Sequence, residues 1–198
     1  MKQKLLDKLK SECEKCVQCD LSKTRTKVVF SDGNPKTAKV VLIGEAPGQN
    51  EDLSGVPFVG RAGKLLDEFL VNAGLSRKDD IYIINTLKCR PPKNRLPSAV
   101  EKAACEHFLL SQIEIVDPKI ILFCGATALK SFVKTKTPIS KIRGEILETE
   151  ISEKKYKSMA IFHPSYLLRN HSLEENSPRD LMLKDLGEVK KLFRLGFI

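Results

Sequence analysis

The stretch KVVLIGEAPG (residues 39–48) sets an apolar, β-branched run directly before a turn that holds an acid and a proline. Similar apolar runs lead into polar or glycine-containing sequence in IYIINTLKC (81–89), KIILFCGAT (119–127) and KSMAIFHPS (157–165). Each run is almost continuously apolar, as expected of a strand that is covered on both faces. The four runs therefore predict the strands of a buried central sheet.

Helical patterns separate and follow these runs. Apolar stripes at helical spacing occupy residues 65–73, 100–115 and 126–133, and a further stripe at 181–192 follows a serine–proline start signal. Strands that alternate with helices are typical of parallel sheets with helices on both faces. We therefore expect an α/β protein, a three-layer α/β/α sandwich around a central four-stranded parallel sheet.

The composition limits the class of protein. A chain of 198 residues, 41% of them hydrophobic, suits a single domain spanning residues 1–198. The net charge of +9, spread along the chain, favours a basic face for a polyanion, with lysine-rich solubility as the alternative. No apolar run approaches the ~18 residues of a membrane span, and residues 1–15 lack the apolar core of a secretion signal. We expect an intracellular, cytoplasmic protein without membrane association.

Unusual residues follow directly after the predicted strands. Ligands of open α/β sheets bind just beyond the carboxyl ends of the strands. Glu45, Asn85, Gly125 and His163 lie at or just after the four predicted ends. We therefore expect one crevice that these residues share.

The cysteines form a second pattern. Cys16 and Cys19 are separated by two residues, Cys13 precedes them at the same spacing, and fifteen residues separate Cys89 from Cys105. In a reducing compartment such thiols are metal ligands or buried side chains before they are disulfides. Two close thiolates and two distant ones suit either a zinc ion or an iron–sulfur cluster. The spacing does not choose between these metals, and Cys13 could replace Cys16 or Cys19.

Four ordered motifs carry a resemblance. GEAPG (44–48), PFVGRAG (57–63), NTLKCRPPKNR (85–95) and HPSYLLR (163–169) together resemble the family-4 uracil-DNA glycosylases, over roughly residues 13–193. The resemblance implies the same three-layer fold and hydrolysis of the uracil N-glycosidic bond, the first step of base excision repair. It also implies a [4Fe–4S] cluster.

That match assigns the cluster ligands and the residues that contact the base. The implied ligands are Cys16, Cys19, Cys89 and Cys105, which leaves Cys13 spare. The remaining assignments concern the pocket. Phe58 would stack on a flipped uracil, Asn85 would pair with its N3–H and O4, and His163 would donate to O2 as charge develops there. A core phenylalanine, a loop-capping asparagine and a structural histidine are the alternatives.

Three further residues are candidates for holding the attacking water and for selecting the base. The resemblance places Glu45 and Ala46 where the superfamily holds the attacking water, and the methyl group of Ala46 offers no general base. Water is then held by Glu45 or by backbone carbonyls, which favours a dissociative route through an oxocarbenium-like sugar. Glu51 matches the position thought to exclude the thymine methyl group; a solvated loop acid is the alternative.

The last motif predicts the contacts with DNA. Leu167 falls where related enzymes insert a side chain into the base stack, with Ser165 and Arg169 near phosphates. Candidates to extend the basic surface are Arg61, Lys64, Lys88 and Arg90, with ordinary solvated side chains as the alternative. The expected partner is uracil-containing DNA, single- or double-stranded, bound by a monomer. A sliding clamp or another repair partner is left open by the sequence.

Three other functions compete with this interpretation. Relatives that capture uracil-DNA covalently carry a basic loop with a histidine, but the corresponding residues 135–143 contain none. An iron–sulfur protein that binds DNA without catalysis would not need Asn85 and His163. A thiol hydrolase using Cys124 and His163 lacks a third orienting group, and Cys124 at the end of an apolar run is expected in the core.

Overall fold

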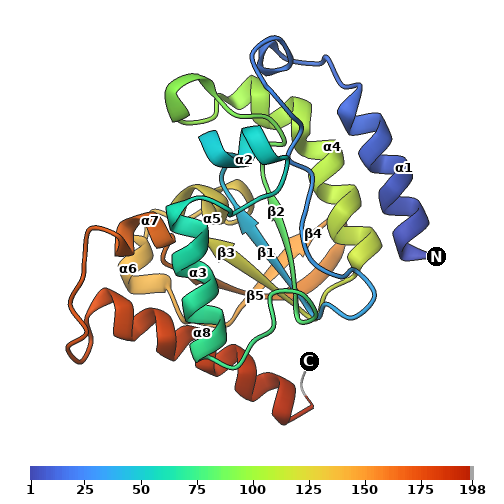
Figure 1. Cartoon of the computed structure of the whole chain (residues 1–198). Helices are drawn as coiled ribbons and strands as arrows, with labels where there is room; N and C mark the ends of the chain where they lie inside the picture. Colours follow the sequence, from blue (N-terminus) through green and yellow to red (C-terminus); the bar gives the residue numbers. More distant parts are fainter. Residues whose placement is uncertain (197–198) are drawn as a thin grey trace.

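The computed structural model describes residues 1–196, in which a five-stranded sheet carries helices on both faces (Figure 1). The strands are β1 (Val40–Gly44), β2 (Ile81–Asn85), β3 (Ile120–Cys124), β4 (Leu147–Ile151) and β5 (Lys154–Ile161). Their order across the sheet is β2-β1-β3-β5-β4. β1, β2, β3 and β5 run parallel to one another, and β4 is antiparallel to β5.

The four predicted strands are confirmed, but the prediction of a four-stranded, wholly parallel sheet is wrong. β4 is an additional edge strand in which Thr149 and Ile151 are buried while the two glutamates between Leu147 and Ile151 are exposed. This alternation is typical of an antiparallel strand with one solvated face. The turn into β5 consists of Ser152 and Glu153, both at positive φ (49° and 66°), where glycine or asparagine is usually found.

The helices form two outer layers. The strands alternate their side chains between these layers: Val40 and Leu42 belong to one buried cluster, whereas Val41 and Ile43 belong to the other. This alternation confirms the predicted three layers. One layer contains α3 (Arg61–Asn72) and α8 (Pro178–Arg194), and the other contains α1 (Lys2–Glu14), α4 (Ala99–Val116) and α5 (Ala126–Phe132). The shorter elements are η1 (Asp20–Lys23), α2 (Gln49–Ser54), η2 (Pro92–Asn94), α6 (Ile139–Ile142) and α7 (Pro164–Leu167).

Helix α1 was not among the predicted elements. Its buried residues Leu6, Leu9 and Cys13 repeat at helical spacing, and α1 packs against α4. The charged residues between them conceal this narrow apolar stripe. None of the helices within residues 1–196 combines the length and apolarity needed to span a membrane.

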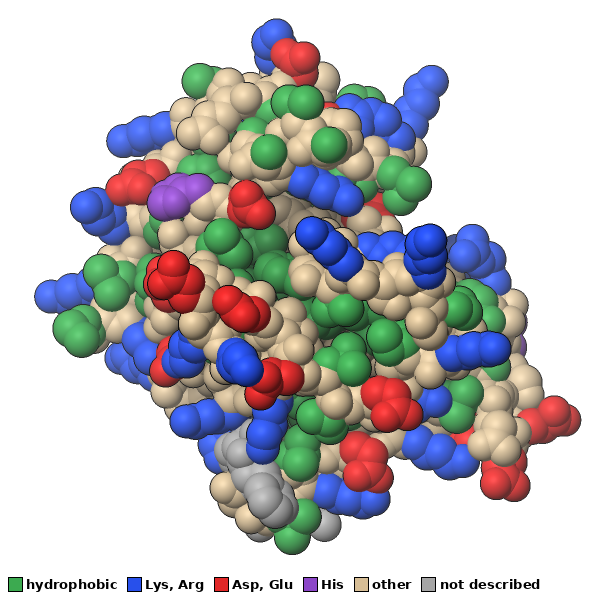
Figure 2. All heavy atoms as spheres, turned by 180° about the vertical axis from the view of Figure 1, so that it is seen from behind, with side chains coloured by type: hydrophobic (Ala, Val, Ile, Leu, Met, Phe, Trp, Pro, Cys, Tyr) green, Lys and Arg blue, Asp and Glu red, His purple; other side chains and the backbone are tan. Residues whose placement is uncertain are grey.

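Both edges of the sheet are protected. Along the outer edge of β2, the backbone of Asp32 exchanges two hydrogen bonds with Ile83, with N···O distances of 3.0 and 2.8 Å. The opposite edge, β4, carries glutamates, one of which pairs with Lys155 of β5. Figure 2 shows that Lys and Arg side chains on the rear face are interspersed with Asp and Glu, so this face is not one continuous basic patch.

Candidate active site at the carboxyl end of the sheet

A cavity of about 300 Å³ opens beyond the carboxyl ends of β1, β2 and β5. The predicted site residues that line it are Glu45, Ala46, Glu51, Phe58, Asn85, His163 and Ser165. The end of β3, with Gly125, lines a neighbouring groove instead. The strand ends therefore converge as the sequence predicts, although over two connected depressions.

Phe58 forms one wall of this cavity. Its buried ring lies 5.8 Å from the His163 ring, at an interplanar angle of 37°. Two glycines make room for it. A Cβ at Gly44 would lie 2.3 Å from Asn85 Oδ1 and 2.7 Å from the Phe58 ring, and a Cβ at Gly63 would lie 1.9 Å from the Phe58 carbonyl oxygen. Only glycine at both positions lets Phe58 lie against the floor formed by Asn85.

Glu51 of α2 braces the chain just after Phe58. Its Oε1 accepts hydrogen bonds from the backbone N–H groups of Val59 (2.9 Å) and Gly60 (2.8 Å). The carboxylate is thus fixed at the edge of the cavity, which distinguishes it from a freely solvated loop acid.

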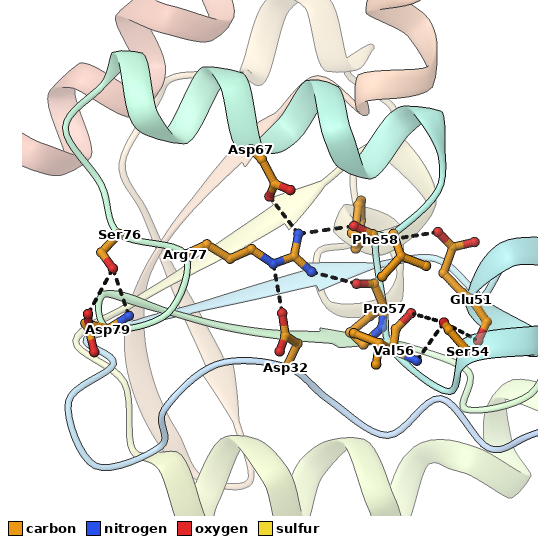
Figure 3. Close-up of polar contacts among 11 residues, drawn as sticks. Asp32, Glu51, Ser54, Val56, Pro57, Phe58, Asp67, Ser76, Arg77 and Asp79 are labelled. Carbon is orange, nitrogen blue, oxygen red and sulfur yellow. Dashed lines mark hydrogen bonds and ion pairs between the residues drawn. The ribbon is translucent and has the colours of Figure 1, made fainter.

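Arg77 holds the same loop from the opposite side (Figure 3). Its Nη2 donates to the Pro57 carbonyl (2.7 Å) and its Nη1 to the Phe58 carbonyl (3.1 Å). Two carboxylates fix the guanidinium, Asp67 of α3 at 2.7 Å and Asp32 at 2.8 Å. Arg77 was not predicted from the sequence, because its partners come from separate segments and no local pattern links them.

Asn85 ends β2 and is buried, paired in register with Gly44 of β1. Its backbone carbonyl accepts a hydrogen bond from Lys88 Nζ at 2.7 Å. Lys88 is fully buried, and burial lowers the pKa of its amine to about 8. The prediction that Lys88 extends the basic surface is therefore wrong: its side chain folds inward to hold the turn that follows Asn85.

His163 faces Phe58 across the cavity as a neutral imidazole. Its Nδ1 accepts from the backbone N–H of Ser165 at 3.1 Å, and Ser165 Oγ lies 2.7 Å from the same atom. Because a backbone N–H can only donate, Nδ1 is the acceptor and the proton resides on Nε2. Burial lowers the pKa of His163 to about 4, with a smaller opposing effect from Glu51.

Residues of the 85–95 motif that received no predicted role also line the cavity. They are Pro91, Asn94 and Arg95. Asn94 has a left-handed backbone (φ 55°), and its Oδ1 accepts from Arg90 Nε at 2.7 Å. The motif located this loop correctly, but only the folded chain shows which of its side chains face the cavity.

A groove of about 530 Å³ adjoins the cavity and shares Glu45, Ala46, His163 and Ser165 with it. Arg169 and Tyr166 line this groove, and 40% of the Tyr166 surface is exposed. Leu167, predicted as the inserted wedge, is fully buried in the core between α3 and α8. In this structure α7 packs against α3 and Leu167 faces the core, so Leu167 does not line the groove.

The sequence of this chain is similar to those of known proteins. A family model described as the uracil DNA glycosylase superfamily matches residues 30–187. The chain belongs to this superfamily. A type-4 uracil-DNA glycosylase of Thermotoga maritima is 45% identical over 194 residues, which cover 98% of this chain and 97% of the relative. One of Archaeoglobus fulgidus is 44% identical, with coverage of 93% and 92%. The family-4 resemblance of the four motifs is thus confirmed.

In this family-4 chain the cysteines gather away from the cavity. Those that line one narrow cleft between the N-terminal segment and α4 are Cys13, Cys16, Cys19, Cys89 and Cys105. All are free thiols, and within residues 1–196 no three or more Cys, His, Asp or Glu side chains are arranged to hold a single metal ion. Cys124 lies in the core, as predicted; burial raises the pKa of its thiol and argues against a nucleophilic thiolate.

Proposed function

We propose that this protein hydrolyses the N-glycosidic bond between uracil and deoxyribose in single- or double-stranded DNA, and so begins base excision repair as a monomer. One observation carries the proposal: the neutral His163 lies in one cavity with the ring of Phe58 and the amide of Asn85. Phe58 provides a stacking surface, Asn85 reads the base edge, and His163 is the hydrogen-bond donor to the leaving group. A flipped base needs all three.

Base recognition rests on Phe58 and Asn85. The ring of Phe58 offers a face on which the uracil stacks, worth about 1–3 kcal/mol. The Asn85 amide accepts from uracil N3–H and donates to O4, a pairing that cytosine reverses at both atoms. Glu51, fixed by two backbone N–H groups, has no freedom to move aside for the methyl group of thymine.

Bond cleavage rests on His163. As the C1′–N1 bond breaks, its electron pair passes to the uracil ring, and the Nε2–H of His163 donates to O2, where negative charge accumulates. Water then attacks C1′ of the oxocarbenium-like sugar. Glu45 or backbone carbonyls orient that water, since Ala46 has no group that accepts a proton. The water loses one proton, and the departing uracil anion takes one up.

DNA binding rests on the groove beside the cavity. Ser165 and Arg169 provide a hydroxyl and a cation for the phosphates next to the flipped nucleotide. Tyr166 is exposed in the same groove, and its side chain inserts into the base stack where the flipped base has left a gap.

The thiols fit a [4Fe–4S] cluster bound by Cys16, Cys19, Cys89 and Cys105, with Cys13 as a spare. A four-iron cluster takes one thiolate at each of four irons, so its ligands stand farther apart than those of a single ion. Burial raises the pKa of Cys105 to about 11 and that of Cys13 to about 12, so thiolates here require compensating positive charge. When bound, the cluster supplies a covalent cross-link between the N-terminal segment and α4.

Two basic side chains support this fit. Arg25 Nη1 donates to Cys89 Sγ at 3.3 Å, and buried Lys88 lies beside the same thiols. Cations at these positions stabilise an anionic thiolate cluster, and the cleft offers them no carboxylate among its lining residues. The cleft and the uracil cavity share no lining residue, which supports a structural role for the cluster.

A strand-cleavage assay tests the activity. Purified protein is incubated with oligonucleotides containing one uracil, single- or double-stranded, and alkali then cuts at abasic sites. We expect cleavage at the uracil position and no protein–DNA adduct on a denaturing gel. A stable adduct without turnover would instead establish the covalent-capture alternative.

Metal analysis tests the cluster. We expect about four irons and four sulfides per chain, as in a Cys₄-bound cluster. Cys89→Ala should lose iron and fold poorly, whereas Cys13→Ala should retain both. Stoichiometric zinc from iron-replete cells, or an iron-loaded and stable Cys89→Ala protein, would contradict the assignment.

A further inference from the structure

We propose that Arg77 is a positioning residue that sets the stacking surface of Phe58 before DNA binds. The inference rests on the proposed function, because Phe58 matters in this way only if a base stacks on it. Arg77 is not among the residues that line the cavity, so it acts through the backbone rather than by contact with uracil.

Arg77 donates hydrogen bonds both to two carboxylates and to the backbone of the Phe58 loop (Figure 3). Guanidinium has five N–H donors in a rigid planar fork. Asp32 and Asp67 bind Nε and Nη1 from separate segments and so fix the plane of the group. Two of the remaining three donors reach the successive carbonyls of Pro57 and Phe58. Because the carboxylates fix the fork, the two carbonyls are fixed as well.

The backbone at Phe58 requires such support. Its φ of 53° lies in the left-handed region, which is unfavourable for a bulky side chain by about 1–3 kcal/mol and persists only where the surroundings determine it. Arg77 holds the peptides before and after the Phe58 Cα. Glu51 holds the next two N–H groups, and the backbone of Gly63 packs directly beneath. The ring is thus held in its stacking position without a ligand.

Loss of this support should weaken capture of the flipped base. Stacking acts on the bound substrate and on the transition state alike, so its loss raises the half-saturating concentration more than it lowers the limiting rate. We expect Arg77→Met to raise the half-saturating enzyme concentration in single-turnover assays about tenfold, within the range that base stacking supplies. Arg77→Lys restores one donor group and should recover part of this loss.

The structure offers a matched control. Arg143 has a similarly buried side chain (15% exposed, against 20% for Arg77) and also pairs with a carboxylate, that of Asp185 at 2.6 Å. It lines neither the cavity nor the groove. Arg143→Met should lower the melting temperature but leave the half-saturating concentration within twofold of the wild-type value.

The decisive test is a double-mutant cycle with Phe58→Ala. If Arg77 acts through the ring, Arg77→Met changes half-saturation by less than twofold once the ring is absent. Effects that multiply, or an Arg143→Met protein as impaired as Arg77→Met, would reduce Arg77 to a general stabilising role and overturn the inference. Should Arg77→Met not fold, Asp67→Asn takes its place in the same cycle, with a smaller expected effect. A wild-type protein that releases no uracil would instead refute the proposed function itself.

Discussion

The two walls of the cavity are built differently. The Phe58 wall is fixed by Arg77 on one side and Glu51 on the other, through four hydrogen bonds to the backbone of residues 57–60. The opposite wall consists of His163 and the exposed Ser165, and beyond the cavity it continues into the groove with the exposed Tyr166 and Arg169. Recognition of a single kind of base requires a rigid surface. Contact with DNA of any sequence requires a surface whose side chains can adjust. Under the proposed function, the rigid wall would read the base and the open wall would contact the DNA around it.

The largest expected effect falls where the two walls face each other. His163→Ala should slow single-turnover uracil release by about 10²–10³-fold, because its donor acts as charge develops, while DNA affinity changes little. Release rates and fluorescence anisotropy with uracil-containing DNA measure the two effects. The control is His107→Ala, on the exposed side of α4. A rate within about twofold of wild type would exclude His163 from the mechanism.

Asn85→Asp tests the floor between the walls. An aspartate replaces the amide donor with an acceptor, and each buried polar group left unpaired costs about 1–3 kcal/mol. We expect most of the uracil activity to be lost. A protonated acid can also satisfy cytosine N3, so weak removal of an unpaired cytosine should appear. Oligonucleotides with a single uracil or a single unpaired cytosine give both rates, and full uracil activity in the mutant would show that Asn85 does not read the base.

Substitutions at the neighbouring residues Tyr166 and Leu167 distinguish the exposed DNA-facing wall from the core beneath it. Leu167→Ala should lower the free energy of unfolding by about 2–5 kcal/mol, as for other fully buried leucines. Tyr166→Ala should leave the melting temperature nearly unchanged and slow release from duplex DNA more than from single strands. Thermal unfolding and the two substrates give the comparison. If Leu167→Ala melts normally and is impaired only on duplex DNA, the wedge belongs to Leu167 after all.

The smallest effect concerns pH. His163 has a folded pKa of about 4 against its ordinary 6.5, so the imidazole should stay neutral as pH falls from 8 to 5. Between these pKa values the unfolded state binds more protons, so the contribution of His163 to stability falls as pH drops below the unfolded value. NMR of the ring nitrogens reports the pKa directly. A measured value above 6 would contradict the desolvated environment derived for His163.

The strands and their functional ends were predictable because buried parallel strands leave uninterrupted apolar runs. β4 was not, since its five residues contain two glutamates and a threonine in place of an apolar run, and its turn uses Ser152 and Glu153 at positive φ. The motifs also gave the position of Leu167 but not its direction, which depends on the packing of α7 against α3.

The residues that line the cavity and the residue that supports it differ in the same respect. Phe58, Asn85 and His163 lie in motifs and were found from the sequence. Arg77 was not, because its role exists only once Asp32, Asp67 and the Phe58 loop have been brought together by folding. Supporting side chains of this kind leave no periodic or spaced pattern in the sequence.

The backbone bridge between Asp32 and Ile83 at the β2 edge affects how molecules of this protein can associate. Exposed strand edges recruit other chains and seed aggregates. Here the backbone of Asp32 covers the β2 edge at Ile83, and the same residue's carboxylate is tied to Arg77. An Arg77 variant that frees this strip would therefore expose an edge for intermolecular pairing. The same ion pair would then serve both the Phe58 loop and the edge of the sheet.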